Sequence, residues 1–522
     1  MQLKKLILRY KSYLPIFLLG AFAFFINYHY GFIGIMPGDN TVLYNGGYKV
    51  LNGYIPFSDY WLVTGPLLDY INAFFFSILG LSWKTFIIHS SLFNLLLALF
   101  SYYLFSSLNL SKKFSIFYSA LISILFYPIV GTPFVDHHST FFMILAFYTF
   151  ILGVYKKRYS YYSIIPFYFC LSFLSKQTPA FYGLISILFL IFLLMLMDKK
   201  NIIKILSPLV IGTFGSLIFL IIFFYSTGIN ISNFIDQYIF YSKTIGDYRF
   251  STFSFKIVDA LINYKFINFF IVILTIILTK LFLKRQKDTR AIFIVLTSLF
   301  LSCVLIFHQY YTFNQNYIFF LIPYLCGIFH IFYKEMFNKK YILILSILVC
   351  VFAVTKYHFR FNEHRKFNEL EKVDISKAID AKEISPDLKG LKWISYYYPD
   401  DPEKEINNLK EVLKILSKDN SKKTIITDYQ FIASALKIHD YSPNQWHHAT
   451  VSFPIKGQKY FQEYKYFFIN NLKKNNINFI FETTKSNKTI TELIVDKSCL
   501  EKKRLSIMLV KLKILKRCKD FQ

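Results

Sequence analysis

Apolar stretches recur along the first two-thirds of the chain, and they constrain its fold more than any other feature. The 522-residue sequence is 55% hydrophobic, and a helix of about 20 apolar residues has the length of a bilayer core. We expect spans near residues 12–32, 84–106, 114–130, 139–155, 161–175, 178–197, 205–225, 263–283, 291–307, 317–333 and 341–355. The sequence thus predicts an α-helical polytopic membrane protein with about 11 transmembrane helices.

The hydrophobicity falls near residue 355, where Lys, Glu, Asn and Asp become frequent. We therefore expect a transmembrane domain over 1–355, whose first outer loop at 33–83 carries interfacial helices, and a soluble domain over 356–522. Within that soluble domain the pattern predicts a helix at 402–418 and strands within 423–430 and 476–483, which is typical of an α/β fold. No small-residue cleavage site follows the first span, so we expect it to be retained.

Positive charge predicts the orientation of the spans, because cytoplasmic loops keep Lys and Arg. The loops expected on the same side of the membrane as the N-terminal segment hold twenty Lys and Arg residues, whereas the loops expected on the other side hold seven. An odd number of spans then places the C-terminal domain outside, in a plasma (inner) membrane protein. The net charge of +28 follows largely from this topology and does not call for a nucleic acid partner.

The loop after the first span contains two well-spaced aspartates. Residues 37–67 read PGDNTVLYNGGYKVLNGYIPFSDYWLVTGPL, and residues 66–80 predict a short interfacial helix that ends at its glycine. Asp39 is either a helix N-cap or a catalytic carboxylate. Asp59 is either a turn residue or a substrate contact.

A second group of polar residues falls at the outer ends of later spans. Asp136, His137 and His138 precede the fourth span, and Lys176 and Gln177 occupy the next outer turn. Neighbouring histidines on a helix point about 100° apart and do not easily bind one metal, so we assign no metal ligand, although a divalent cation stays an alternative. The structural alternative for Asp136 is an N-cap of the fourth span. The structural alternative for Lys176 is a side chain that extends to lipid headgroups rather than to a phosphate.

Other outer polar residues are less specific. His308, Gln309 and the run 314–316 form a late polar turn, and the segment 226–262 is typical of a mobile lid. In the C-terminal part, Asp428–Gln430 and Asn444–His448 either contact a glycan or pack in loops, and Cys499 and Cys518 either form a disulfide or stay reduced. The sequence lacks a phosphate-binding P-loop, a dinucleotide fingerprint and a zinc helix, which argues against nucleotide chemistry.

The stretch GDNTVLYNGGYKVLNGYIPFSDYWLVTGPLLDYINAFFFSILG resembles the first extracytoplasmic loop of GT-C glycosyltransferases, particularly the branch of protein O-mannosyltransferases and lipid A aminoarabinose transferases. The residues that carry the resemblance are Asp39, Gly53, Pro56, Asp59, Pro66, Leu67 and Gly80, followed in order by Asp136 and Lys176. Motif content is confined to about the first 200 residues. The histidines at 137 and 138, and Gly65 where relatives often carry Lys, depart from the family pattern.

The resemblance implies a GT-C-like fold and inverting transfer of a sugar from a polyprenyl-phosphate donor to a glycan, lipid or protein acceptor. It implies that Asp39 is the general base and that Lys176 supports the departing phosphate. The expected substrate-binding residues are Asp59, Asp136, His137, Lys176, Gln177 and His308.

Two other functions are also compatible with a chain that has many membrane spans. A transporter or flippase of lipid-linked glycans would place its site near the bilayer midplane, and a polymerase or ligase would depend on outer arginines. Among the expected outer loops of the membrane half only Arg249 is an arginine. The enzyme is therefore the favoured hypothesis.

Overall fold

The chain folds into two compact units, each built from segments that are distant in the sequence. The computed structural model describes residues 2–252, 257–283, 288–312, 317–337, 339–486 and 488–515, with the backbone alone for 2–12, 257 and 334–336. The first unit comprises Met1–Gly31, Ile87–Ile221 and Phe253–Phe367, and the second comprises Phe32–Phe86, Ile222–Thr252 and Asn368–Gln522.

This division differs from the sequence-based one, which put a single boundary near residue 355. The loop at 33–83, expected within the transmembrane domain, belongs to the same compact unit as the C-terminal segment. Hydropathy reports which segments avoid water, and it carries no information on which polar segments pack together. A boundary drawn from hydropathy alone therefore misses this association.

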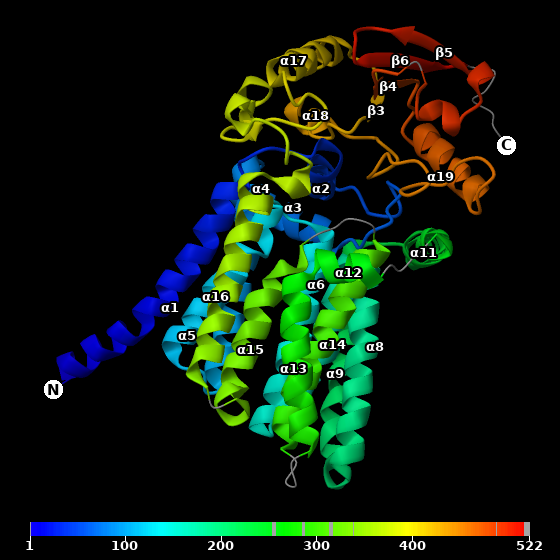
Figure 1. Cartoon of the computed structure of the whole chain (residues 1–522). Coiled ribbons are helices and arrows are strands. Elements are labelled where there is room, and N and C mark those ends of the chain that lie inside the picture. The colour runs from blue at the N-terminus through cyan, green and yellow to red at the C-terminus, as the bar shows by residue number, and fades with distance from the viewer. Residues whose placement is uncertain are drawn as a thin grey trace. The chain divides into compact units, whose positions relative to one another are not determined.

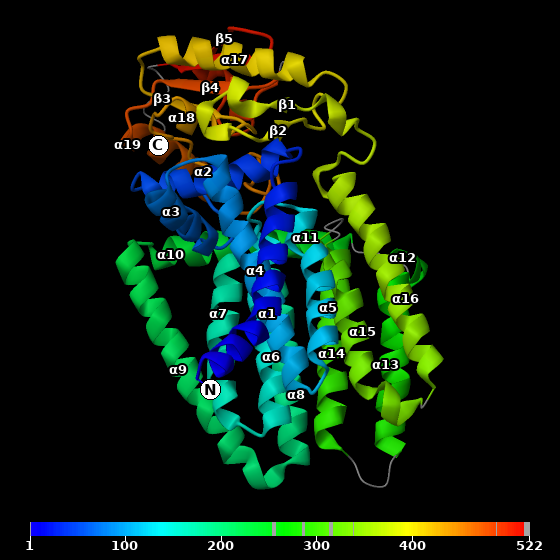
Figure 2. The same cartoon turned by 90° about the vertical axis from the view of Figure 1, so that its left-hand side faces the viewer.

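The first unit consists of apolar helices that run side by side (Figures 1 and 2). Their bounds are α1 Gln2–Tyr30, α4 Trp83–Ser107, α5 Lys112–Ile124, α6 Val135–Lys156, α7 Ile165–Ser175, α8 Gln177–Met197, α9 Ile202–Thr227, α12 Ile257–Asn263, α13 Lys265–Leu283, α14 Thr289–Tyr311, α15 Leu321–Met336 and α16 Lys340–Tyr357. The start of α4 and the end of α9 belong to the second unit.

Eight helices of the described residues are long and apolar enough to cross a membrane, which confirms an α-helical membrane protein. The span in α6 is 94% buried and that in α9 only 11%, so α6 forms the core of the bundle while α9 presents apolar side chains outward. Of the remaining predicted spans, α5 and α7 are shorter because 3-10 turns at Tyr127–Ile129 and Tyr159–Ile164 take up part of each apolar run. The number of about 11 stays a prediction.

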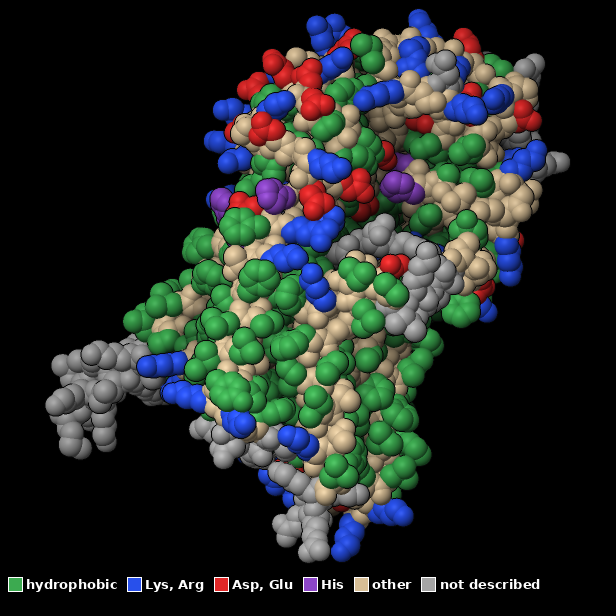
Figure 3. Space-filling model, in the orientation of Figure 1, with side chains coloured by type: hydrophobic (Ala, Val, Ile, Leu, Met, Phe, Trp, Pro, Cys, Tyr) green, Lys and Arg blue, Asp and Glu red, His purple; other side chains and the backbone are tan. Residues whose placement is uncertain are grey.

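Hydrophobic side chains cover the helices of the first unit on the face shown in Figure 3, and Lys and Arg side chains gather at the lower end of these helices. This distribution is typical of helices that face lipid and end at a polar boundary.

The second unit combines short helices with a small sheet (Figure 1). Its helices are α2 Pro37–Leu51, α3 Leu67–Leu79, α10 Ile231–Phe234, α11 Ser242–Ser251, α17 Pro402–Lys418, α18 Ile432–Ala435 and α19 Phe461–Lys474, and its strands are β1 Ile379–Asp380, β2 Lys392–Trp393, β3 Lys423–Ile426, β4 Phe479–Thr483, β5 Leu500–Arg504 and β6 Leu509–Ile514. In the described part of this unit, four strands form a sheet in the order β3-β4-β6-β5, with β3 and β4 parallel and the other pairs antiparallel.

Several predicted elements of this unit are present. The helix expected at 402–418 is α17, whose first turn is capped by Asp401, and the two expected strands are β3 and β4. The helix expected at 66–80 is α3, which ends at Gly80 with a positive φ of 81°, a conformation that glycine adopts without strain.

The segment 226–262, expected to be a mobile loop, is mostly helical where it is described. A π-helix at Ile235–Tyr241 connects α10 to α11, and Gln237 within it is buried. Its side chain accepts from Leu62 N at 3.0 Å and donates to Phe57 O at 2.8 Å. The part of this segment around Gln237 is therefore packed within the second unit, whereas α12 at its end belongs to the first unit.

Candidate active site

Asp39 lies in the first turn of α2, but it does not cap the helix. Met36 is the N-cap residue, and Pro37 occupies the first helical turn, where its missing N–H is not needed. The Met36 N–H donates to Asn40 Oδ1 at 2.8 Å. The N-cap alternative for Asp39 is therefore wrong, and its carboxylate is partly exposed.

The surroundings of Asp39 within the second unit are acidic and aromatic. A Cβ built on the preceding Gly38 would lie 3.4 Å from His448 Nε2 and 3.9 Å from Asp428 Oδ1. Burial raises the pKa of Tyr396, and the negative charges of Asp428 and Asp39 add to that increase. The carboxylates of Asp39, Asp428 and Glu369 thus all lie within electrostatic range of the Tyr396 hydroxyl, and we call this region the polar patch.

α2 is fixed to this patch by Thr41. Its hydroxyl donates to Asp428 O at 2.8 Å and accepts from Gln430 N at 2.9 Å. The Asp428 carboxylate accepts from Tyr397 OH at 2.6 Å. The position of Asp39 is therefore set by a rigid helix whose first turns are bonded to the strand-end residues 428–430.

Asp59 performs two structural tasks. One carboxylate oxygen accepts from Ile55 N at 2.8 Å, which closes a turn, and the other lies 2.9 Å from Lys474 Nζ. The turn alternative is confirmed for Asp59. Lys474 is 67% exposed, so this ion pair remains open to water.

Asp136, Lys176 and His308 form a cluster within the first unit. Lys176 Nζ donates to both oxygens of Asp136, at 2.8 and 2.7 Å, and His308 Nε2 lies 3.0 Å from Asp136 Oδ1. Phe134 is the N-cap of α6 and no side chain bonds the cap, so the N-cap alternative for Asp136 is wrong. The sequence predicted these three residues as substrate contacts, and the structure brings them together.

Lys176 is the single residue between α7 and α8. It has an extended backbone, with φ −159° and ψ 141°, and α8 begins at Gln177. Its carbonyl accepts from Ser139 Oγ at 3.0 Å. Its side chain is 15% exposed whereas that of Asp136 is fully buried, so the pair can be reached by solvent or ligand only from the lysine side.

The two adjacent histidines point into different surroundings, as their spacing predicted. The His137 ring packs against Tyr317, with ring centroids 4.5 Å apart. His138 bonds Tyr127, and its Nε2 lies 2.8 Å from His89 Nε2. Among the described residues no three His, Cys, Asp or Glu side chains are arranged to hold a metal ion.

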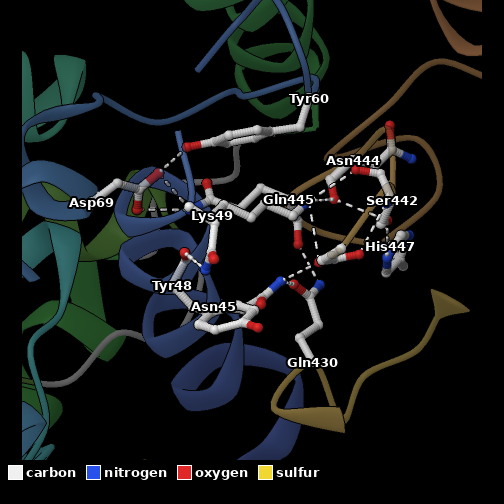
Figure 4. A network of polar contacts seen from close by, with 12 residues as sticks. Asn45, Tyr48, Lys49, Tyr60, Asp69, Gln430, Ser442, Asn444, Gln445 and His447 are labelled. Carbon is white, nitrogen blue, oxygen red and sulfur yellow. Dashed lines mark hydrogen bonds and ion pairs between the residues drawn. The ribbon is translucent and has the colours of Figure 1, made fainter. Parts of the chain in front are cut away.

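Sequence reasoning missed a buried polar network in the second unit (Figure 4). Lys49 has no exposed side-chain surface and lies 3.4 Å from Asp440 Oδ2. Its Nζ donates to Ser442 O at 2.8 Å and to Asn444 O at 3.3 Å. A buried charge is stable only when polar or oppositely charged groups replace the water that it has lost, as these partners do for Lys49.

Asp69 of α3 is the second buried charge of the network. Its oxygens accept from Tyr60 OH at 2.8 Å and from Gln445 Nε2 at 2.9 Å. Burial raises the pKa of Asp69 to about 7, against the opposing effects of these hydrogen bonds and of Lys49. Burial likewise lowers the pKa of Lys49, and Asp440 counteracts that decrease.

The pair Gly46–Gly47 makes this network sterically feasible. A Cβ on Gly46 would lie 2.1 Å from Asp69 Oδ1, and one on Gly47 would lie 2.5 Å from Asn72 Cβ. Glycine within a helix costs about 1 kcal/mol relative to alanine, yet here it permits close approach of α2 and α3. The two glycines, and an aspartate on the buried face of an apolar helix, were the available sequence signals.

Some of the remaining predicted residues pack inside the protein, and others lie outside the described residues. Asn444–His447 are buried, and Asn444 Nδ2 donates to Tyr464 OH at 2.6 Å, as expected for loop packing. Gln309 Oε1 accepts from Tyr317 N at 3.2 Å. Residues 314–316 and Cys518 lie outside the described residues. Of the two alternatives for Cys499, a disulfide or a reduced thiol, the structure has the disulfide.

Comparison with known proteins gives no independent identification. No protein-family model matches the chain, and no curated protein matches it. The functional argument therefore depends on the residues of this chain alone.

Proposed function

We propose that the protein is an inverting glycosyltransferase that moves a sugar from a polyprenyl-phosphate donor to an extracytoplasmic glycolipid, polysaccharide or protein acceptor, with Asp39 as the general base. The observation that carries the proposal is the position of Asp39: it is a partly exposed carboxylate in the first turn of α2, a helix that Thr41 bonds to residues 428 and 430. A general base must be both fixed and accessible to its substrate.

The proposed reaction balances with these groups. The acceptor hydroxyl gives its proton to the Asp39 carboxylate, and its oxygen forms a bond to the anomeric carbon. The bond from that carbon to the phosphate oxygen breaks, and the polyprenyl phosphate leaves with the electron pair. Attack from the face opposite the phosphate inverts the anomeric carbon.

In this proposal Lys176 supports the departing phosphate. Asp136 and His308 keep its ammonium group oriented through the contacts described above, and its partial exposure leaves an N–H available for an anion. His137 and Gln177 are the remaining substrate residues of the proposal, and Asp59 contributes through the turn that its carboxylate closes. The proposal includes a GT-C-like arrangement of about eleven spans in the plasma membrane, with residues 356–522 as an extracytoplasmic α/β domain.

The test is transfer in membrane vesicles that contain a radiolabelled polyprenyl-phosphate sugar. Asp39→Asn is expected to lower the rate by roughly 100-fold or more at unchanged membrane levels. Asp247→Asn, which changes an exposed carboxylate of α11 in the same unit, is the matched control and is expected to match the wild type.

Wild-type-like transfer by Asp39→Asn would refute the assignment of the base. Translocation of the intact donor without its consumption would instead favour a flippase. Orientation is tested separately, since a reporter fused after residue 400 is expected to be active only outside the cytoplasm.

A further inference from the structure

The second unit contains an open groove of about 760 Å³ that the proposed chemistry does not use. One wall is a single face of α19, and the opposite side is formed by the turn at Ser58–Trp61 and by residues of α10 and the following π-helix. From α19 the residues at positions 463, 466, 467, 470, 471, 473 and 474 line it. This spacing corresponds to one continuous helix face.

The two faces of α19 serve different purposes. The inward face carries Phe461, Tyr464, Phe468 and Leu472, which are buried, and Tyr464, Phe468 and Leu472 belong to the hydrophobic core under the sheet. The groove face carries instead an acid, two aromatics, two amides and two lysines. Phe467 and Asn471 also take part in packing, whereas Glu463, Tyr466 and Asn470 are not part of the core.

Aromatic residues form a platform in the groove. Tyr466 is 70% exposed and has no ring partner among the described residues. Phe467 packs edge-to-face on Trp61, with ring centroids 5.5 Å apart, and Trp61 itself is buried. A rigid, accessible tyrosine beside a fixed aromatic pair offers an apolar surface for a flat ligand with C–H groups on one side.

Polar side chains surround this platform. Asp236, Glu463 and Asn470 line the groove, and none of them makes a side-chain hydrogen bond or ion pair within the described residues. An ionised carboxylate accepts hydrogen bonds through both oxygens, and an amide both accepts and donates, so together they can bind neighbouring hydroxyl groups. Each of these three side chains is therefore available to a ligand rich in hydroxyls.

The charge balance disfavours a polyanion as the ligand. Asp236 and Glu463 oppose Lys473 and Lys474, and Lys474 is already paired with Asp59. The groove therefore presents nearly balanced charge, with amides between the charged groups. Aromatic surface combined with paired acceptors and little net charge matches the chemistry of a saccharide.

The backbone at the end of the groove is strained. Tyr460, the residue that precedes α19, has a φ of +68°, a left-handed conformation that costs a bulky residue about 1–2 kcal/mol. The π-helix at Ile235–Tyr241 is likewise a rare conformation, and such turns are frequent at functional sites. Both irregular segments contribute residues to the same groove.

We infer that this groove binds a saccharide chain, and that the bound chain is the acceptor glycan. The identity of the chain as acceptor rests on the proposed function, whereas saccharide binding itself does not. Tyr466 provides the stacking surface, and Asp236, Glu463 and Asn470 bind hydroxyl groups.

The test is saturation-transfer NMR on the full-length protein in a detergent without sugar headgroups. The probe is the mixture of oligosaccharides released by mild acid from the envelope of the producing cells. Wild type is expected to transfer saturation to sugar protons, and Tyr466→Ala is expected to weaken binding about tenfold. Tyr466→Trp keeps a stacking surface and is expected to retain binding.

Tyr248→Ala is the matched control, because Tyr248 of α11 is 71% exposed in the same unit and does not line the groove. Absence of sugar signals with wild type, or equal signals with Tyr466→Ala, would overturn the inference. Binding of peptides from a digest of envelope proteins, lost in Tyr466→Ala, would also overturn it in favour of a peptide site.

The same experiment separates this inference from the proposed function. Asp39→Asn is expected to bind the oligosaccharides as wild type does while transferring no sugar. If Asp39→Asn transfers normally and wild type still binds through Tyr466, the base assignment fails and the saccharide site stands. If Asp39→Asn is inactive and wild type binds no saccharide, the groove inference alone fails.

Discussion

Two buried lysine–aspartate pairs, one in each unit, differ in how closed they are. Lys176 of the first unit is 15% exposed beside a fully buried Asp136. Lys49 of the second unit has no exposed surface, and Asp440 has 6%. A pair that can be reached from one side is able to exchange a partner for a ligand, whereas a fully enclosed pair can only stabilise the fold. Burial of a charge thus has different meanings in the two units.

The largest expected effect is the loss of the enclosed lysine. Lys49→Met leaves Asp440 and Asp69 buried without a cation, so the free energy of unfolding is expected to fall by about 3–5 kcal/mol. The measurement is denaturant unfolding of the detergent-solubilised protein, followed by the fluorescence of the four tryptophans, all of which lie in the second unit.

Lys410→Met is the control for this variant, because Lys410 and Glu383 form an exposed ion pair, 42% and 48% accessible. Its loss is expected to change stability by less than about 1 kcal/mol. Equal effects of the two substitutions would show that the enclosed pair has no special importance.

In the accessible pair, the loss of Lys176 is expected to lower the free energy of unfolding more than the loss of the Asp136 carboxylate. Lys176→Met leaves the buried Asp136 carboxylate with the His308 contact, and we expect a loss of about 1–3 kcal/mol. Asp136→Asn leaves a lysine that can turn toward water or headgroups, so it is expected to cost less. Thermal unfolding in detergent measures both variants. Should Asp136→Asn prove the more destabilising, Lys176 would be as enclosed as Lys49.

The last expected effect is a pH dependence that arises from Asp69 in the second unit and develops gradually with pH. The pKa of Asp69 is raised to about 7 in the folded protein, so the folded state binds a proton that the unfolded state releases near pH 4. The stability from this group is present below pH 4 and is lost as the pH rises to about 7, with a slope of at most about 1.4 kcal/mol per pH unit.

Asp69→Asn removes this titration. Its amide can still accept from Tyr60, and Gln445 can turn its side-chain oxygen toward the new N–H group. Unfolding midpoints between pH 4 and 7 are therefore expected to decline less in Asp69→Asn than in wild type. Parallel declines would assign the pH dependence to other groups.

The comparison also explains what the sequence could predict. Asp136, Lys176 and His308 each stand at the end of an apolar run, so hydropathy alone marks them as unusual polar residues. The helices and strands 402–418, 423–426 and 479–483 follow from local periodicity. Asp39 was found because turn residues and a family resemblance draw attention to its loop.

The enclosed network could not be predicted by the same reasoning. Lys49 contacts Ser442, 393 residues away in the sequence, whereas Lys176 and Asp136 are 40 residues apart. No local pattern links such distant polar residues, and Lys49 resembles any other loop lysine. The groove was missed for a similar reason, since it combines three segments whose individual composition is ordinary.

The separation between Lys49 and its partners also sets the order of events during biosynthesis. A ribosome makes the chain from the N-terminus, so Asn45, Lys49 and Asp69 are synthesised long before residues 440–445 exist. Until then these side chains lack their partners at Asp440, Ser442 and Gln445, and α2 cannot reach its final arrangement. The polar network around α2 is therefore completed only late in synthesis.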